Sequence, residues 1–126
     1  MTEWTGDELN KIGAADELEI ASLRKDGSLR KSRTIWVVRV VDDLYVRSVN
    51  GRGSDWFRGV LTRHTGRIQA GGVEKDVAFI EVNEPRLHDQ IDAAYRKKYS
   101  RQPKAYVDAC LTQQALDATI RLAPRG

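Results

Sequence analysis

Arginine is the residue type whose distribution points most directly to chemistry. Residues 24–67 hold eleven Lys or Arg and four Asp, and nine of the eleven cations are Arg. A planar guanidinium can form two parallel hydrogen bonds to a phosphate or a carboxylate. This segment has a net charge of +7, against −5 for residues 1–23 and +1 for residues 68–126. The pattern predicts either a site for an anionic ligand or solvated basic faces that the acidic N-terminal segment partly neutralises.

A glycine-rich loop lies inside this basic segment. The loop Asn50-Gly51-Arg52-Gly53-Ser54 precedes a predicted short helix that Ser54 or Asp55 can cap. Such a loop presents free backbone amides to an anion, and the flanking Arg47 and Arg58 can pair with phosphate oxygens. We therefore predict a phosphate site here. A turn that needs glycine, beside exposed arginines, is the alternative interpretation.

Other residue types show no catalytic or metal-binding pattern. His64 and His88 lack a placed partner, so we assign no general acid or base. Cys110 is the single cysteine, which rules out an intrachain disulfide, and we expect it to be a small buried hydrophobe. The sequence contains no Gly-x-Ser-x-Gly elbow or Walker loop, and its acidic residues lack the spacing of a metal site. The catalytic residues are unknown at this stage, and no metal is expected.

A predicted β-hairpin positions the basic segment. Two apolar runs, Thr34–Val41 and Leu44–Val49, flank Asp42-Asp43. With these two aspartates as the turn, Val38 would face Arg47 across the hairpin. Both faces of the hairpin are mostly apolar, so it needs cover on both sides. We expect a barrel interior on one face, and a helix, a ligand or a second subunit on the other.

The remaining elements surround this hairpin and predict a small closed β-barrel with helices packed outside it. The first half of the chain adds a helix from the capping box at Thr5 to about Ala15, a strand at 18–21 and a helix with Trp56 and Phe57. The second half adds strands at 65–70 and 73–82, a helix capped by Asn83 and reaching Tyr99, a short turn or helix at 105–110, a short helix at 112–118 and a strand at 119–124.

Four runs within residues 17–80 also match the pattern of a known superfamily. They are Thr34–Val38, Asp43–Ser48, Gly53–Arg58, and Gly66–Ile68 with Gly71-Gly72. In these runs the chain resembles the FMN-binding split β-barrel superfamily, and within it a bacterial family of unknown function. That family is similar to the pyridoxamine-phosphate-oxidase-like and deazaflavin-dependent nitroreductase-like proteins. The resemblance implies a mainly β fold with α, a split β-barrel of about six antiparallel strands with flanking helices, as a single domain over residues 1–126.

The resemblance further implies a cofactor, a partner and a set of site residues. It implies a homodimer that binds FMN, or alternatively a deazaflavin, in a groove between subunits, with oxidoreductase-like activity supplied by the cofactor. By position, Arg47 and Ser48 match the strand residues near the phosphate. Trp36 and Trp56 would line the ring or support the groove. The cofactor-binding candidates are Trp36, Arg47, Ser48, Arg52, Ser54, Trp56 and Arg58.

Two other functions are consistent with the same sequence. A barrel that has lost the flavin could be a non-enzymatic module that binds another small anion in its basic groove. Arginines interleaved with Trp and Tyr could instead bind nucleic acid. The net charge of only +3 and the acidic N-terminal segment disfavour a long polyanion, so this alternative ranks third.

Composition excludes several further classes. Apolar residues make up 40% of the chain and charged residues 31%, which disfavours intrinsic disorder. Apolar runs such as Ile35–Val38 are far shorter than the roughly 20 residues of a membrane-spanning helix. Glu3, Asp7 and Glu8 stand where a secretory signal would have basic residues. We therefore expect a cytoplasmic protein with no membrane association.

Overall fold

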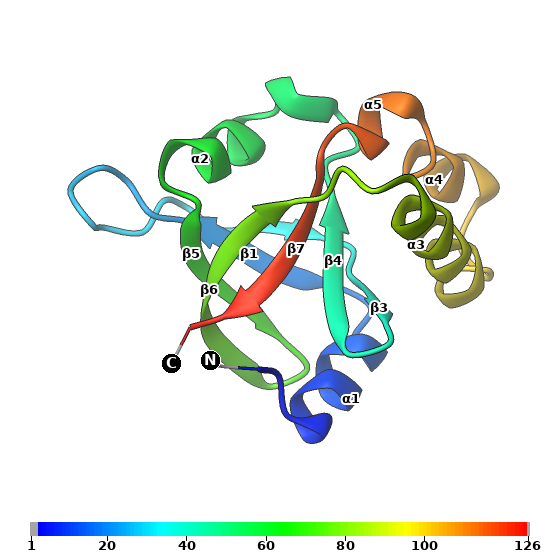
Figure 1. The fold of residues 1–126 in the computed structure, drawn as a ribbon, viewed down its shortest axis with the longest axis horizontal. Helices are drawn as coiled ribbons and strands as arrows, with labels where there is room; N and C mark the ends of the chain where they lie inside the picture. The colour runs from blue at the N-terminus through cyan, green and yellow to red at the C-terminus, as the bar shows by residue number, and fades with distance from the viewer. Residues whose placement is uncertain (1–2, 126) are drawn as a thin grey trace.

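In the computed structural model, which describes residues 3–125, seven antiparallel strands form one curled sheet (Figure 1). The sheet order is β2-β1-β5-β6-β7-β4-β3. The strands are β1 (Leu18–Ser22), β2 (Arg33–Ile35), β3 (Val38–Val40), β4 (Asp43–Arg47), β5 (Thr65–Ala70), β6 (Val73–Glu81) and β7 (Thr119–Pro124). The expected split β-barrel is confirmed, and the expected bounds of β5 and β7 match the observed ones.

The sheet curls without closing: among the described residues its edge strands β2 and β3 are not paired with each other, so the closed barrel that was expected is a split one, and the chain passes directly from one edge to the other. β2 pairs with β1 and β3 pairs with β4, so these two consecutive strands lie at opposite edges of the sheet. Only Trp36 and Val37 separate them. The single strand expected over Thr34–Val41 is therefore two short strands, which is why the sheet has seven strands where about six were expected.

The predicted register of the β3–β4 hairpin is wrong by two residues. Val38 pairs with Tyr45, where Arg47 was expected, and Asp43 belongs to β4, where it pairs with Val40. The carboxylate of Asp43 also lies 3.8 Å from the guanidinium of Arg121 on the neighbouring strand β7, which favours its position in the sheet. Because side chains alternate with a period of two, a shift of two residues leaves every side chain on its predicted face.

Five α-helices and one 3₁₀ turn surround the described part of the sheet. They are α1 (Gly6–Ala14), η1 (Gly51–Gly53), α2 (Asp55–Arg63), α3 (Pro85–Lys98), α4 (Lys104–Ala109) and α5 (Gln113–Leu116). The capping box of α1 is confirmed, with reciprocal hydrogen bonds between Thr5 and Glu8. Asn83 is not the N-cap of α3. Glu84 is, because Pro85 takes the first helical position, where its missing N–H costs nothing.

The hairpin is covered on both faces, as expected. Leu44 and Val46 point into the barrel interior and belong to its apolar core. Val38 and Tyr45 point outward into a second apolar cluster, with residues of α3 and α4. In Figure 1, α3 and α4 lie beside β3 and β4, outside the barrel. This outer layer of helices forms one wall of the site described below.

Candidate functional site

A pocket of about 320 Å³, here called the aromatic pocket, lies where β2, the end of β4, α2 and α4 meet. Its volume is at the lower end of the range of roughly 300–1,000 Å³ typical of small-molecule sites. Its lining includes four aromatic side chains, Trp36, Trp56, Tyr95 and Tyr106. The other lining residues are Thr34, Ile35, Arg47, Ser48, Val49, Asn50, Ala109 and Cys110.

Trp36 is held in place by Tyr99, the residue that follows α3. The two rings are stacked nearly parallel, with their centroids 3.9 Å apart and their planes at 5°. The Tyr99 hydroxyl accepts a hydrogen bond from the Val37 N–H at 3.2 Å, and it is 2.9 Å from the Asp16 carbonyl, to which it can donate. Tyr99 therefore fixes the backbone at the point where the chain changes sheet edges, and it presents Trp36 to the pocket.

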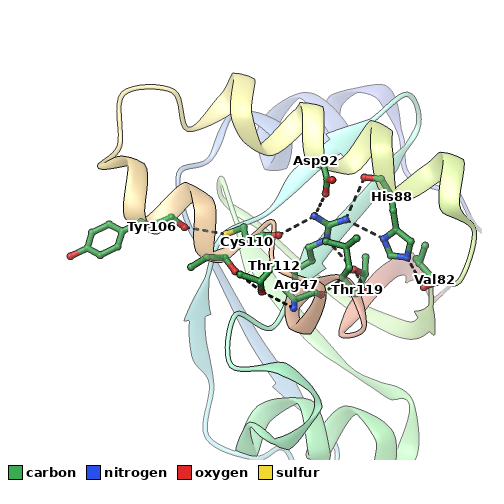
Figure 2. A network of polar contacts seen from close by, with 11 residues as sticks. Arg47, Val82, His88, Asp92, Tyr106, Cys110, Thr112 and Thr119 are labelled. Carbon is green, nitrogen blue, oxygen red and sulfur yellow. Dashed lines mark hydrogen bonds and ion pairs between the residues drawn. The ribbon is translucent and has the colours of Figure 1, made fainter.

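The guanidinium of Arg47 is fully buried, and each of its five N–H groups has a protein acceptor within reach (Figure 2). The acceptors are Thr119 Oγ1 at 3.0 Å, the Asp92 carboxylate, the Cys110 carbonyl at 3.0 Å, His88 Nδ1 at 3.1 Å and the His88 carbonyl at 3.4 Å. These contacts join β4 to α3, α4 and β7. Arg47 lines the aromatic pocket, but no N–H of its side chain is left for a phosphate.

The two histidines take structural positions. His88 Nδ1 lies beside an Arg47 N–H and so acts as an acceptor, which leaves the proton on Nε2, 3.2 Å from the Val82 carbonyl. His64 caps the C-terminus of α2 in the left-handed conformation, with φ +58°. Neither imidazole lines the aromatic pocket.

Ser48 and Ser54 hold the glycine-rich loop together. The Ser48 hydroxyl donates to the Gly51 carbonyl at 2.8 Å, and the Ser54 Oγ lies 2.8 Å from the Ser48 Oγ. Since the Ser48 proton is used on Gly51, Ser54 is the donor of the second bond. These bonds shape the loop that follows β4 and leads into α2.

The other two arginine candidates, Arg52 and Arg58, form ion pairs and hydrogen bonds within the chain. Arg52 pairs with Glu81 at 2.6 Å and donates to the Asp117 carbonyl at 2.9 Å. Arg58 is exposed and pairs with Asp55 at 3.1 Å. Of the seven predicted site residues, the structure gathers Trp36, Arg47, Ser48 and Trp56 at one pocket and sets Ser54 against Ser48, whereas Arg52 and Arg58 do not line that pocket.

A second pocket, of about 200 Å³, shares Trp56 with the aromatic pocket and is here called the cationic pocket. Its lining holds four cationic residues and one acid: Arg24, Arg30, Lys31, Arg33 and Asp55. The other lining residues are Ile20, Ser22, Trp56 and Val60. None of these four cations was among the site residues predicted from the sequence, which came from the predicted hairpin and the loop and helix after it, whereas these lie in and beside the turn between β1 and β2. The sequence feature that could have indicated them is the presence of five Lys or Arg within residues 24–33.

Arg30 carries the clearest unfilled hydrogen-bonding capacity in the cationic pocket. Its Nε is buried and has no hydrogen-bond partner among the described residues. Its side chain packs over Gly59 of α2, where a Cβ would come within 3.1 Å of the Arg30 Cδ. A buried donor of this kind is ordinarily satisfied by an acceptor, so an anion in the cationic pocket would supply what the protein lacks.

Cys110 is a buried hydrophobe, as expected. Its side chain belongs to the outer apolar cluster, and burial raises the pKa of the thiol to about 11, although nearby Arg47 acts to lower it. The thiol therefore stays protonated at neutral pH and is a poor nucleophile.

Two structural features bear on broader classes of function. Within residues 3–125, no group of three or more His, Cys, Asp or Glu side chains is arranged to bind a metal ion. No helix in the described part of the chain is both long enough and apolar enough to cross a bilayer.

Comparison with known proteins gives a family match and structural neighbours. The model of a family described as "Uncharacterized protein conserved in bacteria (DUF2255)" matches residues 8–122. No curated protein matches the sequence.

Three solved structures illustrate the similarity in fold. The heme storage protein HutZ from Vibrio cholerae aligns with a TM-score of 0.66 at 12% identity, over 99% of this chain and 92% of its own. An F420-H2-dependent reductase aligns with a TM-score of 0.64 at 13% identity, over 85% and 93%. An FAD-binding protein from Mesorhizobium loti aligns with a TM-score of 0.56 at 17% identity, over 99% and 93%. At these identities the likeness is one of fold.

Proposed function

The chain belongs to the DUF2255 family of bacterial proteins, and on that premise we propose that it binds a phosphorylated flavin-type compound, FMN or a deazaflavin. The ring would occupy the aromatic pocket and the phosphate the cationic pocket. Similar structures that are described as FAD-binding or as F420-H2-dependent support a ligand of this class.

One observation carries the proposal: the aromatic and cationic pockets adjoin at Trp56. A flat conjugated ring is matched by aromatic walls, against which it can stack. A phosphate is matched by guanidinium groups, which pair with two of its oxygens at once. A compound that joins a ring to a phosphate by a short chain would fill both pockets together.

The cationic pocket has unused capacity for a phosphate. Arg30 Nε lacks a partner among the described residues, and the nearest carboxylate oxygen to the Arg33 guanidinium is that of Asp55, at 3.9 Å. Arg47, by contrast, is occupied by its five acceptors. We therefore assign phosphate binding to Arg24, Arg30, Lys31 and Arg33, and we assign to Arg47 the role of holding the walls of the aromatic pocket.

A bound flavin would supply hydride or electron transfer, and the chain would supply binding and orientation. Trp36, backed by Tyr99, presents a rigid surface for the ring. Asn50 adds a polar side chain to the lining of the same pocket. The protein with its cofactor bound would have oxidoreductase-like activity.

The proposal includes a homodimer with this pocket at its interface. Two lining residues at the mouth of the aromatic pocket are apolar or aromatic and solvent-exposed: Val49 at 40% and Tyr106 at 62%. A second copy of the chain would cover them and exclude water from a bound ring.

The test compares FMN with riboflavin, which has the same ring and no phosphate. Titration of the protein should quench the flavin fluorescence and raise the melting temperature with FMN, and riboflavin should bind at least about tenfold more weakly, the effect of losing one charge-assisted contact. Arg33→Glu should remove the preference for FMN. The matched control is Arg96→Glu, the same charge reversal on an exposed residue of α3, and it should leave the preference intact.

Each outcome bears on a separate part of the proposal. Equal affinity for FMN and riboflavin in the unsubstituted protein would overturn the phosphate assignment. Neither quenching nor a thermal shift with FMN or with a phosphorylated deazaflavin would overturn the proposed function. If both Arg33→Glu and Arg96→Glu removed the preference for FMN over riboflavin, the preference would come from the net charge of the protein and not from the cationic pocket.

A further inference from the structure

A third pocket, of about 250 Å³, lies between α1, β3 and α3 and has no lining residue in common with the two described above. It is lined by Gly13, Val38, Arg39, Ala94, Lys97 and Lys98. Three of these residues are cationic and none is acidic. The last two, Lys97 and Lys98, are adjacent in the sequence, but the structure gives them different surroundings.

The amine of Lys98 is held against the protein without a counter-ion. Its Nζ donates to the Val37 carbonyl at 2.6 Å and lies 5.1 Å from the centre of the Tyr99 ring. Lys11, Lys75 and Lys104 each pair with a carboxylate, but none of the ion pairs among the described residues includes Lys98. An ammonium that is partly desolvated and unpaired in this way loses part of the stabilisation that water would give it.

The charged and titratable groups around this amine come from each element that packs on it. Arg39 of β3 and Lys97 of α3 add positive charge at the pocket, the Tyr99 hydroxyl is bound to backbone, and Asp16, after α1, acts in the opposite direction. Desolvation exceeds the effect of Asp16 and lowers the pKa of Lys98 to about 8. A substantial share of this amine is therefore neutral near pH 8, with a free lone pair.

We propose that Lys98 is a site of acylation by acyl phosphates. The lone pair of Nζ attacks the acyl carbon and forms the C–N bond of an amide. The bond between that carbon and the bridging phosphate oxygen breaks, and the phosphate leaves with the bonding electron pair. The proton lost by the nitrogen passes to the departing phosphate or to water, and nothing is oxidised or reduced.

The pocket favours this class of donor over a neutral one. Lys97 is exposed and belongs to none of the ion pairs among the described residues, so its charge is free to attract the phosphate of the donor. Arg39 of β3 also lines the pocket, although its Nε is bound to the Val41 carbonyl, one terminal nitrogen to Asn10, and the other lies 3.9 Å from the Asp42 carboxylate, so Lys97 supplies most of the free positive charge. Reaction at Lys98 would alter the contact with Val37, where the chain crosses between sheet edges.

The experiment uses the whole protein with acetyl phosphate and no flavin, so its outcome is independent of the proposed function. After a brief reaction at pH 8, digestion at acidic residues and mass spectrometry would give the acetylated fraction of each lysine. Lys98 should react about tenfold faster than Lys97, because the amine of Lys98 is partly desolvated and has no counter-ion, whereas Lys97 is exposed to water. The rate at Lys98 should fall as the pH is lowered from 8 to 6, because the protonated amine has no lone pair.

The chain unfolded in urea provides the first control, and there the advantage of Lys98 over Lys97 should disappear. Equal rates at the two residues in the folded protein, or the same advantage in the unfolded chain, would overturn the proposal. Lys97→Gln tests the choice of donor. It should slow acetylation of Lys98 by acetyl phosphate but not by acetic anhydride, which is uncharged. Equal slowing with both donors would overturn the assignment to acyl phosphates.

Discussion

Arg47 is an arginine whose position in the sequence predicted one role and whose contacts in the structure give it another. Its position near the end of a hairpin strand, before a glycine-rich loop, predicted contact with a phosphate. In the structure its acceptors come from residues 41 to 72 positions away in the sequence, and they enclose the guanidinium completely. A buried arginine that is fully hydrogen-bonded acts on the site indirectly, by fixing the elements that form its walls.

The ion pair between Arg47 and Asp92 gives a stability prediction at this scale. Asp92→Ala leaves the buried guanidinium without its carboxylate, so the free energy of unfolding should fall by about 3 kcal/mol, the usual cost of breaking a buried pair. Asp89→Ala is the matched control, because Asp89 is exposed on the same helix and its change has the same effect on helix propensity. Urea unfolding of both variants measures the difference. An equal fall in the free energy of unfolding in the two variants would show that the ion pair does not stabilise the protein, and that the loss comes only from the change in helix propensity.

At the scale of elements, local chemistry determined most boundaries, and the β3–β4 turn is the exception. The turn residues are Val41 and Asp42, and Val41 adopts φ +56°. A β-branched residue is disfavoured in this left-handed region, where Gly or Asn is usual. Val41 is therefore not a residue type that predicts a turn. The two aspartates predicted the turn at Asp42-Asp43, one residue after its observed position.

Relief of this strain should stabilise the protein. Val41→Asn is expected to raise the free energy of unfolding by about 1 kcal/mol, the order of the left-handed penalty for an ordinary residue. Val41 is 76% exposed, so its replacement loses little packing. Val41→Thr keeps the branched Cβ and adds polarity, and it should give no gain. Thermal and urea denaturation of the two variants test this, and equal stabilisation by both would point to polarity and not to backbone conformation.

At the scale of the whole molecule, the path of the chain between the two edges of the curled sheet creates the site. The chain crosses between sheet edges at Trp36 and Val37, and Tyr99 holds that crossing through a stacked ring and a hydrogen bond. The same crossing puts Trp36 on the wall of the aromatic pocket. The cationic pocket forms where the turn before β2 meets α2. Both pockets therefore depend on how distant segments meet.

The proposed homodimer is tested at this same scale. Light scattering after size-exclusion chromatography should give twice the chain mass of 14.2 kDa. Tyr106→Asp would place a charge on the apolar rim of the aromatic pocket and should shift the protein toward monomer at micromolar concentration. Leu29→Asp, the same kind of change at another exposed apolar residue, should leave the mass unchanged. A monomeric mass for the unsubstituted chain would contradict the dimer.

The sequence by itself determined the features that depend on near neighbours. The helix start at Thr5 and Glu8 and the strands at Thr65–Ala70 and Thr119–Pro124 follow from capping and from alternating side chains, which act over a few residues. The apolar character of both hairpin faces likewise predicted a barrel interior on one side and a cover on the other.

Only the tertiary structure decided which arginine side chains have all their N–H groups bonded within the protein and which keep a donor for a ligand. Arg47 is enclosed because Asp92, Cys110 and Thr119 converge on it from elsewhere in the chain. Arg30 packs over Gly59 of α2, which is distant in the sequence, and there its Nε is buried without a hydrogen-bond partner among the described residues. The sequence determines that a guanidinium is charged, but folding determines its partners, because contacts between distant segments exist only in the folded chain.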